Sequence, residues 1–213
     1  MTIAEQVWAL DVTKGSYAYL IAEPHGAILI DTGMPGRAGA MLDEIKGLGL
    51  SPGDLRTIVL THHDIDHIGN AKALQEATGA ELWAPALDAP YILGERARPG
   101  IKRLVATLVR PPRPNLSGLY ADGQRFGELR AIHAPGHTPG HSILAYGRVL
   151  FIGDLVYIKA GTPRLLPKLG TADAATARAS IGLLKSLEFD WLCPAHGEPT
   201  RDGPAVRAFL ADY

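Results

Sequence analysis

Two stretches of this chain repeat one local pattern, and the repeat narrows the choice of fold more than any other feature. In each stretch an apolar segment, a glycine-containing turn and a second apolar segment lead to an aspartate: residues 16–31 end at Asp31, and residues 142–154 end at Asp154. Short runs rich in Ile, Val, Leu and Tyr around glycine turns are typical of β-hairpins buried on at least one face. The sequence therefore predicts two hairpins of the same design.

Helical patterns follow both hairpins. We expect helices over residues 37–48 and 70–78 after the first hairpin, and one over residues 174–187, with Asp173 as its N-cap, after the second. Strands followed by helices, twice over, predict an α/β sandwich of two related halves within a single domain, residues 1–213. Loops at the strand ends of both halves then meet at one edge.

Seven of the eight histidines lie in three short segments, residues 62–67, 133–141 and 194–197. The first segment directly follows the apolar run 57–60 and alternates histidines with aspartates. Such side chains at the end of a strand can place several lone pairs on one ion, whereas the lone Cys193 cannot supply a thiolate site. The three segments therefore predict a metal site at the shared sheet edge.

Composition limits the partners of the chain. With 46% hydrophobic residues it can bury a substantial core, and a formal net charge of −1 gives no general attraction for polyanions. We therefore expect a small-molecule substrate and no nucleic acid. Residues 1–7 lack a signal-peptide pattern, no apolar run reaches membrane-spanning length, and one cysteine allows no internal disulfide. We expect no membrane partner and a cytoplasmic location.

Residues 88–122 differ from the rest because they are basic. Their cations are Arg96, Arg98, Lys102, Arg103, Arg110 and Arg113. Apolar residues at helical spacing precede Pro111-Pro112, namely Ile101, Leu104, Val105 and Leu108. We interpret the segment as an inserted amphipathic helix. Three roles remain open: a surface helix packed on the body, a lid or wall of the substrate pocket, or a contact with a second copy in a homodimer or with a membrane surface.

The pattern His-x-Asp-x-Asp-His at positions 62–67 resembles the metallo-β-lactamase fold superfamily, as an HxDxDH variant of its HxHxDH motif. Four further positions match the family's order along nearly the whole chain: Asp31 before this motif, and His137, Asp154 and His196 after it. The resemblance implies a four-layered αβ/βα sandwich with the metals at one edge of two sheets. That architecture agrees with the two hairpins found above.

The resemblance also implies the ligands. One ion would be bound by His62, Asp64 and His137, and a second by Asp66, His67 and His196, with Asp154 between them. The family usually has histidine where this chain has Asp64, so the site is more anionic than usual. Two divalent ions are expected, with zinc first, and the extra carboxylate also suits manganese or iron.

Several nearby residues have roles that the sequence leaves open. Asp31 is either a turn carboxylate or a hydrogen-bond acceptor for a ligand histidine. His63 is expected to be a loop histidine, and His133 and His141 are expected to support the ligand loops. Cys193 is expected to be a small buried residue.

The resemblance implies a hydrolase in which a hydroxide bridging two ions attacks a small ester, lactone or thioester. Because only residues 197–213 follow His196, we expect none of the long C-terminal region that holds glutathione in glyoxalase II enzymes. A phosphodiesterase and a mononuclear iron persulfide dioxygenase are the alternatives. Asp66 is either a ligand or a general base, and Tyr157 is either an oxyanion donor or a packed aromatic. Arg96, Arg98 and Lys102 could meet an anionic group of the substrate.

Overall fold

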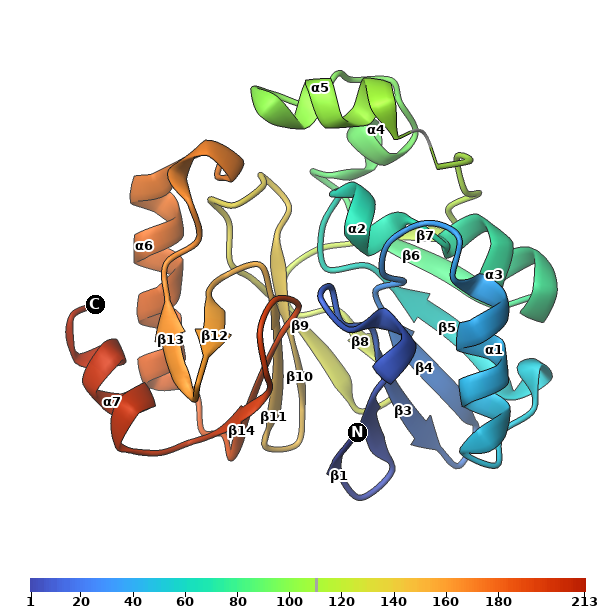
Figure 1. The fold of residues 1–213 in the computed structure, drawn as a ribbon, viewed down its shortest axis with the longest axis horizontal. Helices are drawn as coiled ribbons and strands as arrows, with labels where there is room; N and C mark the ends of the chain where they lie inside the picture. The colour runs from blue at the N-terminus through green and yellow to red at the C-terminus, as the bar shows by residue number, and fades with distance from the viewer. Residues whose placement is uncertain (110) are drawn as a thin grey trace.

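The computed structural model describes residues 1–109 and 111–213, so Arg110 of the basic segment lies outside the described residues, as do the side chains of Ile101 and Val105. Two sheets face each other at the centre of the molecule (Figure 1). The first has the strand order β1-β2-β3-β4-β5-β6-β7. Its strands are β1 (Thr2–Ala4), β2 (Val7–Ala9), β3 (Tyr19–Glu23), β4 (Gly26–Ile30), β5 (Leu55–Val59), β6 (Glu81–Pro85) and β7 (Gly118–Tyr120).

The second sheet has the order β15-β14-β11-β10-β9-β8. Its strands are β8 (Arg125–Phe126), β9 (Leu129–His133), β10 (Ser142–Tyr146), β11 (Val149–Gly153), β14 (Trp191–Pro194) and β15 (Thr200–Arg201). A separate hairpin pairs β12 (Tyr157–Lys159) with β13 (Thr162–Arg164).

Helices cover the outer face of each sheet, with α1 and α3 on the first and α6 and α7 on the second (Figure 1). The α-helices are α1 (Ala38–Gly47), α2 (Ile65–Ile68), α3 (Ala71–Thr78), α4 (Ala89–Ile92), α5 (Ile101–Leu108), α6 (Ala174–Gly182) and α7 (Pro204–Ala211). Short 3₁₀ helices are η1 (Asp11–Thr13), η2 (Pro52–Asp54), η3 (Lys168–Gly170) and η4 (Leu183–Ser186). The order helix, sheet, sheet, helix confirms the predicted four-layered αβ/βα sandwich.

Each interface between layers has its own apolar core. Between the sheets, Tyr19 and Phe151 are buried with their ring centroids 5.0 Å apart. A second core, including Leu29 and Met41, lies between the first sheet and its helices, and a third, including Ile152 and Ile181, lies beneath α6 and α7. Burial of apolar surface on both faces explains the near-continuous hydrophobic runs in β4 and β11.

The sequence repeat corresponds to a structural repeat. The hairpin β3–β4 and the hairpin β10–β11 are both antiparallel, and the second strand of each then pairs in parallel with the next strand of its sheet, β5 or β14. Asp31 follows β4 and Asp154 follows β11. Both aspartates therefore occupy equivalent positions, directly after the second strand of a hairpin.

The boundaries of two predicted elements differ from those observed. The first strand begins at Tyr19 rather than at Ser16, because Ser16 Oγ donates a hydrogen bond to the Asp66 carbonyl and Tyr17 N donates one to the Ala195 carbonyl. The last predicted helix follows Asp173, whose carboxylate accepts hydrogen bonds from two backbone amides as expected of an N-cap, but it becomes a 3₁₀ turn after Gly182. Glycine is a poor helix former, which accounts for the early end.

The basic segment does not stand wholly outside the body, since residues 118–120 form β7 and pair with β6. Before that strand, α4 and α5 lie above the edge where the two halves meet (Figure 1). Leu104 and Leu108 of α5 are 60% and 78% exposed, so these two apolar side chains are not packed on the body. Among the described residues, none of the helices has the length and apolar character needed to cross a membrane.

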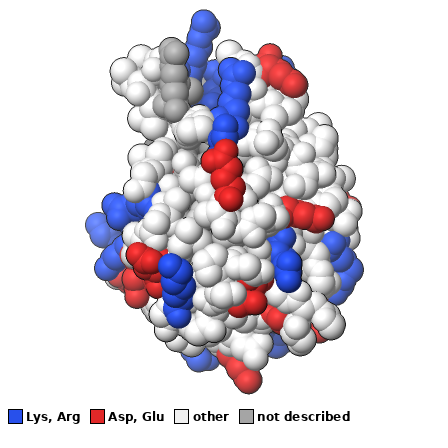
Figure 2. All heavy atoms as spheres, turned by 90° about the vertical axis from the view of Figure 1, so that its right-hand side faces the viewer, with Lys and Arg blue, Asp and Glu red and all other residues white. Residues whose placement is uncertain are grey.

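Charged side chains of both signs are interspersed over the face that carries α1 and α3 (Figure 2). This face therefore has no broad field of one sign, in keeping with the net charge of −1.

Candidate metal centre

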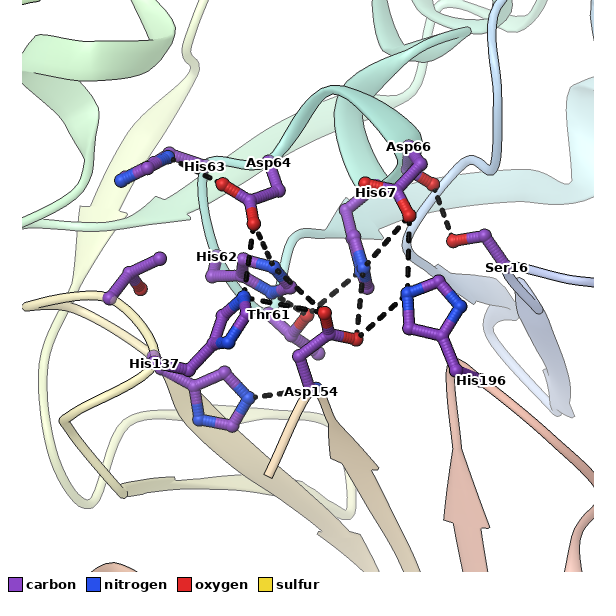
Figure 3. A network of polar contacts seen from close by, with 12 residues as sticks. Ser16, Thr61, His62, His63, Asp64, Asp66, His67, His137, Asp154 and His196 are labelled. Atoms are coloured by element: carbon purple, nitrogen blue, oxygen red, sulfur yellow. Dashed lines mark hydrogen bonds and ion pairs between the residues drawn. The ribbon is translucent and has the colours of Figure 1, made fainter. Parts of the chain in front are cut away.

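The predicted ligands come from four strand ends and meet at one edge of the two sheets (Figure 3). Residues 61–67 follow β5 and enter α2, and His137 lies in the loop between β9 and β10. Asp154 directly follows β11, and His196 follows β14. These residues form two groups, one of His62, Asp64, His137 and Asp154, and one of Asp66, His67 and His196.

In the first group, Asp64 Oδ2 lies 3.5 Å from His62 Nε2 and 3.0 Å from His137 Nε2. Asp154 Oδ2 lies 4.0 Å and 3.3 Å from the same two nitrogens. Ligand atoms at ordinary zinc distances around one tetrahedral ion are about 3.3 Å apart. The spacing of these side chains therefore suits one ion.

The second group has similar spacing. Asp66 Oδ2 lies 3.9 Å from His67 Nε2 and 3.2 Å from His196 Nε2. The other carboxylate oxygen of Asp154, Oδ1, lies 3.3 Å from His67 Nε2 and 3.4 Å from His196 Nε2. Asp154 thus presents one oxygen to each group.

For three of the four imidazoles, a hydrogen bond on the far side of the ring determines which nitrogen faces the centre. Thr61 Oγ1 lies 2.7 Å from Asp31 Oδ2 and must donate its hydrogen to that carboxylate, so it accepts from His62 Nδ1 at 3.0 Å. His67 Nδ1 donates to Asp31 Oδ2 at 2.8 Å, and His196 Nδ1 donates to the Gly15 carbonyl at 2.6 Å. In the neutral rings, which are the form that binds a metal, all three Nε2 atoms therefore present lone pairs.

Acceptors that face only acceptors need a cation between them. His62 Nε2, His67 Nε2 and Asp154 Oδ1 are buried and have no hydrogen-bond partner. Neutral imidazole lone pairs and carboxylate oxygens cannot satisfy one another, so the cluster needs either protons on its histidines or metal ions, and an unpaired buried polar atom costs about 1–3 kcal/mol. The donor set and its spacing thus fit divalent metal ions.

The pKa values of the metal-free groups reflect the same excess of negative charge. Although burial acts in the opposite direction, hydrogen bonds to Asp154 and Asp66 raise the pKa of His196 to about 10. Burial likewise opposes the shift at His67, but the carboxylates of Asp31, Asp154 and Asp66 raise its pKa well above the usual value. The second group therefore attracts positive charge strongly.

The structure assigns the roles that the sequence left open for the neighbouring residues. Asp31 is a hydrogen-bond acceptor for His67, and it holds Thr61 by both its amide and its hydroxyl. Buried His141 donates from Nδ1 to the Ala134 carbonyl and accepts from the amide of Asp154 at Nε2. Burial and the nearby His137 lower the pKa of His141 to about 3, so it stays neutral and orients Asp154.

The remaining supporting histidines lie farther from the centre. His133 donates from Nε2 to the Pro139 carbonyl and steadies the loop that carries His137. His63 is buried, with its ring centroid 4.5 Å from that of Tyr91 and its Nδ1 3.1 Å from Asp64 Oδ1. Cys193 is fully buried between the sheets, as predicted.

Asp88 supports the ligand loops, a role that the sequence did not indicate. Its fully buried carboxylate accepts hydrogen bonds from His63 N, Thr138 Oγ1 and Gly140 N at 3.0, 2.6 and 2.7 Å. It therefore joins the loop that carries His62 to the loop that carries His137. The available signal was its place shortly after a strand, since it lies three residues after β6, whereas Asp31 and Asp154 directly follow their strands.

The sequence also could not predict where the cationic side chains of the basic segment lie. Lys102 Nζ lies 2.6 Å from Asp64 Oδ2 and 3.1 Å from His137 Nε2. Arg98 donates two hydrogen bonds to the His63 carbonyl, at 3.2 and 2.8 Å. Both side chains lie beside the first group of ligands.

A cavity of about 450 Å³ opens in front of both groups. Its walls combine Arg98 and Lys102 with apolar side chains, among them Met34, Ile65, Val109, Leu166 and Leu169. Tyr157 lies half-buried in β12, paired with Arg164, and is not among the described residues that line this cavity. Five of the seven predicted ligands therefore line the cavity, whereas His62 and His67 are fully buried and Tyr157 lies outside the lining.

Comparison with known proteins adds relatives at about 30% identity. The Bacillus subtilis protein named probable metallo-hydrolase YflN is 32% identical over 210 residues, which cover 86% of this chain and 80% of that protein. A hydroxyacylglutathione hydrolase of Albidiferax ferrireducens is 30% identical, covering 90% of this chain but only 66% of its own length. An N-acyl homoserine lactonase of a Bacillus species is 27% identical, covering 80% of this chain and 75% of that one.

The solved structure of TTHA1623 in a di-iron-bound form is 29% identical, with a TM-score of 0.70, and the match covers 87% of this chain and 89% of that one. A family model described as the metallo-beta-lactamase superfamily matches residues 12–196. This range contains every predicted ligand. The chain therefore belongs to the metallo-beta-lactamase superfamily.

Proposed function

We propose that this chain is a binuclear metal-dependent hydrolase of a small ester, lactone or thioester. One observation carries the proposal: the two oxygens of Asp154 face different ligand groups, Oδ2 toward His62 and His137 and Oδ1 toward His67 and His196. A carboxylate shared in this way suits two ions side by side. Zinc is the proposed ion, and iron or manganese are the alternatives that the added carboxylate of Asp64 suits.

When bound, two divalent ions supply Lewis acidity toward a carbonyl oxygen and activate water for attack. The residues of the chain position and orient that chemistry. Burial acts to raise the pKa of Asp66, but His67 and His196 lower it, so this carboxylate is ionised at neutral pH and available as a ligand or proton acceptor. The apolar wall of the cavity excludes water from the bound substrate.

The substrate class rests on the relatives and on the cavity. A hydroxyacylglutathione is a thioester and an N-acyl homoserine lactone is a cyclic ester, and enzymes named for each share about 30% identity with this chain. A volume of about 450 Å³ suits a small molecule. We also propose a cytoplasmic location, in keeping with a chain whose single cysteine forms no internal disulfide.

Metal content tests the binuclear proposal. The protein, purified without chelator and without added metal, should contain about two ions per chain by elemental analysis. A single iron per chain would contradict the binuclear hydrolase and favour a mononuclear dioxygenase acting on a persulfide. Panels of lactones, thioesters, simple esters and phosphodiesters then separate the hydrolase classes, and turnover of phosphodiesters alone would contradict the proposed substrates.

Replacement of a ligand tests the catalytic role. His67→Ala should abolish turnover while leaving the circular dichroism spectrum close to that of the parent chain, because the ring contributes ligand atoms at the edge of the sheets. His25→Ala is the matched control, since His25 is exposed in the turn between β3 and β4. Full turnover by His67→Ala would contradict the proposal.

Tyr157 is tested separately. As an oxyanion donor its hydroxyl would have to reach the substrate carbonyl, and removal of such a donor lowers kcat by about 10²–10³-fold. Tyr157→Phe with unchanged kcat would assign this ring a packing role.

A further inference from the structure

We propose that Lys102 competes with the metal at the first ligand group, so that the second group binds its ion first and more tightly. This inference rests on the proposed metal-dependent function and describes how the same site is filled. It assigns the inserted helix α5 a direct part in metal binding, beyond that of a wall or a lid.

The contacts of Lys102 carry the inference. Its side chain is only 12% exposed, although it lies on a helix above the sheet edge. The ammonium lies 2.6 Å from Asp64 Oδ2, 3.1 Å from His137 Nε2 and 3.4 Å from the His137 carbonyl oxygen. All three contacts are made with members of the first group. Among the described residues, none of the ion pairs of Lys102 involves the second group.

The contact with His137 excludes a metal at the same atom. An ammonium is only a hydrogen-bond donor, so Nε2 must be the acceptor in this pair. An imidazole nitrogen has a single lone pair, which cannot accept a hydrogen bond and coordinate an ion at once. Binding of an ion to His137 therefore requires Lys102 to move away from it.

The contact with Asp64 explains why a cation is present. The family usually has a neutral histidine at this position, and Asp64 adds a negative charge at the first group. Lys102 supplies the opposite charge, so the pair together has the formal charge of the histidine that it replaces. Close opposite charges in a site shielded from water attract strongly. The ammonium therefore competes with a divalent ion for Asp64.

Helix α5 carries Lys102, so displacement of this side chain by a metal ion should affect the helix. It contacts η3 across the cavity, and the adjoining Arg98 is anchored to the His63 carbonyl. Displacement of Lys102 removes one of the polar contacts that hold α5 above the ligands. We therefore expect the first group to take up its ion with a loosening of α5.

Zinc titration of chelator-treated protein tests the inference, with stepwise affinities measured by competition against a chromophoric chelator. We expect one tight and one weaker step in the parent chain. Lys102→Met should strengthen the weaker step by about tenfold or more, because the competing charge is gone. Lys102→Arg should keep it weak, and Lys102→Ala is a second neutral variant in case the methionine disturbs folding.

Arg103→Met is the matched control, because it removes a cation from the neighbouring, exposed position of the same helix. It should leave both steps unchanged. The weaker step is assigned to the first group if His196→Ala, which damages the second group, abolishes the tight step. Persistence of the tight step in that variant would overturn the proposed order of binding.

Hydrogen exchange supplies a readout independent of affinity. Amides of residues 98–108 should exchange faster after the second equivalent of zinc than after the first. Unchanged exchange, or equal affinities in the parent chain and Lys102→Met, would overturn the competition while leaving a binuclear hydrolase intact. Failure to bind zinc, iron or manganese in any variant would instead overturn the proposed function.

Discussion

The carboxylate of Asp31 holds the imidazole of His67 by a hydrogen bond of 2.8 Å between Oδ2 and Nδ1. Asp31 directly follows β4, and it adopts a positive φ of 58°, which is uncommon for a residue with a side chain. The same carboxylate accepts the amide and hydroxyl of Thr61, so its orientation is held from two sides. One residue at the end of the first hairpin thus orients a predicted ligand from the loop after β5.

Asp31→Asn should weaken metal binding at the second group by about 10–100-fold, because an amide is a poorer acceptor for His67 and Thr61. Zinc affinity measured by chelator competition checks this. Asp122→Asn is the control, since the exposed Asp122 accepts only the His133 amide among its described contacts, away from the ligands. Unchanged affinity in Asp31→Asn would show that the hydrogen bond does not position His67.

Metal binding should release protons near neutral pH. Hydrogen bonds to Asp154 and Asp66 outweigh burial and raise the pKa of His196 to about 10, so the metal-free chain keeps that ring protonated at pH 7. A proton must leave for each protonated ligand, and metal affinity should therefore rise about tenfold per pH unit per proton as the pH approaches that pKa. Calorimetry in buffers of different ionisation enthalpy counts the protons, and affinity independent of pH between 6 and 8, roughly the range below that pKa, would contradict the assignment.

The raised pKa of His196 has the opposite effect on the stability of the metal-free chain: raising the pH should strengthen metal binding but destabilise the metal-free fold. A histidine whose pKa is raised by folding stabilises the folded state fully below its ordinary pKa of about 6.5. That stabilisation is lost as the pH rises toward the folded value of about 10. The melting temperature of the metal-free chain should therefore fall between these limits, and the fall should be smaller in His196→Ala.

Asp88→Ala should destabilise the chain by about 1–3 kcal/mol, because three buried donors lose their acceptor. These donors are His63 N, Thr138 Oγ1 and Gly140 N, which belong to the two loops on either side of the first group. Thermal unfolding measures the loss, and zinc affinity should fall with it. Asp43→Ala on the exposed face of α1 should change neither quantity, and equal melting temperatures for both variants would rule out the proposed link between the loops.

Gly153→Ala should damage the centre by contact as well as by backbone strain. Gly153 has a φ of 47°, and an added Cβ would lie 2.8 Å from His141 Nε2 and 3.0 Å from Thr61 Oγ1. Gly147 has a similar φ of 53° but open space around its Cα, so Gly147→Ala isolates the cost of strain, which is about 1–3 kcal/mol. Only Gly153→Ala should also weaken zinc binding, and equal zinc affinity in the two variants would contradict the role of His141 in orienting Asp154.

Much of the fold could be predicted because its signals are local. Alternation of apolar runs with glycine turns predicted the hairpins β3–β4 and β10–β11, and the N-cap pattern at Asp173 predicted the start of α6. The strand register and the parallel pairing of β4 with β5 and of β11 with β14 required the tertiary structure, since they depend on residues far apart in the chain.

The sequence by itself determined which residues are candidate ligands, because histidines and aspartates at strand ends follow a recognisable spacing and family order. Only the tertiary structure decided what surrounds them. Lys102 reaches Asp64 from a helix 38 residues farther along the chain, and Asp88 joins two loops through hydrogen bonds to backbone amides, which side-chain identity does not encode. The sequence left Tyr157 open between an oxyanion donor and a packed aromatic, and the pairing of β12 with β13 decides where its ring lies. Local spacing can identify candidate metal ligands, whereas the charges and contacts that surround them arise from long-range packing.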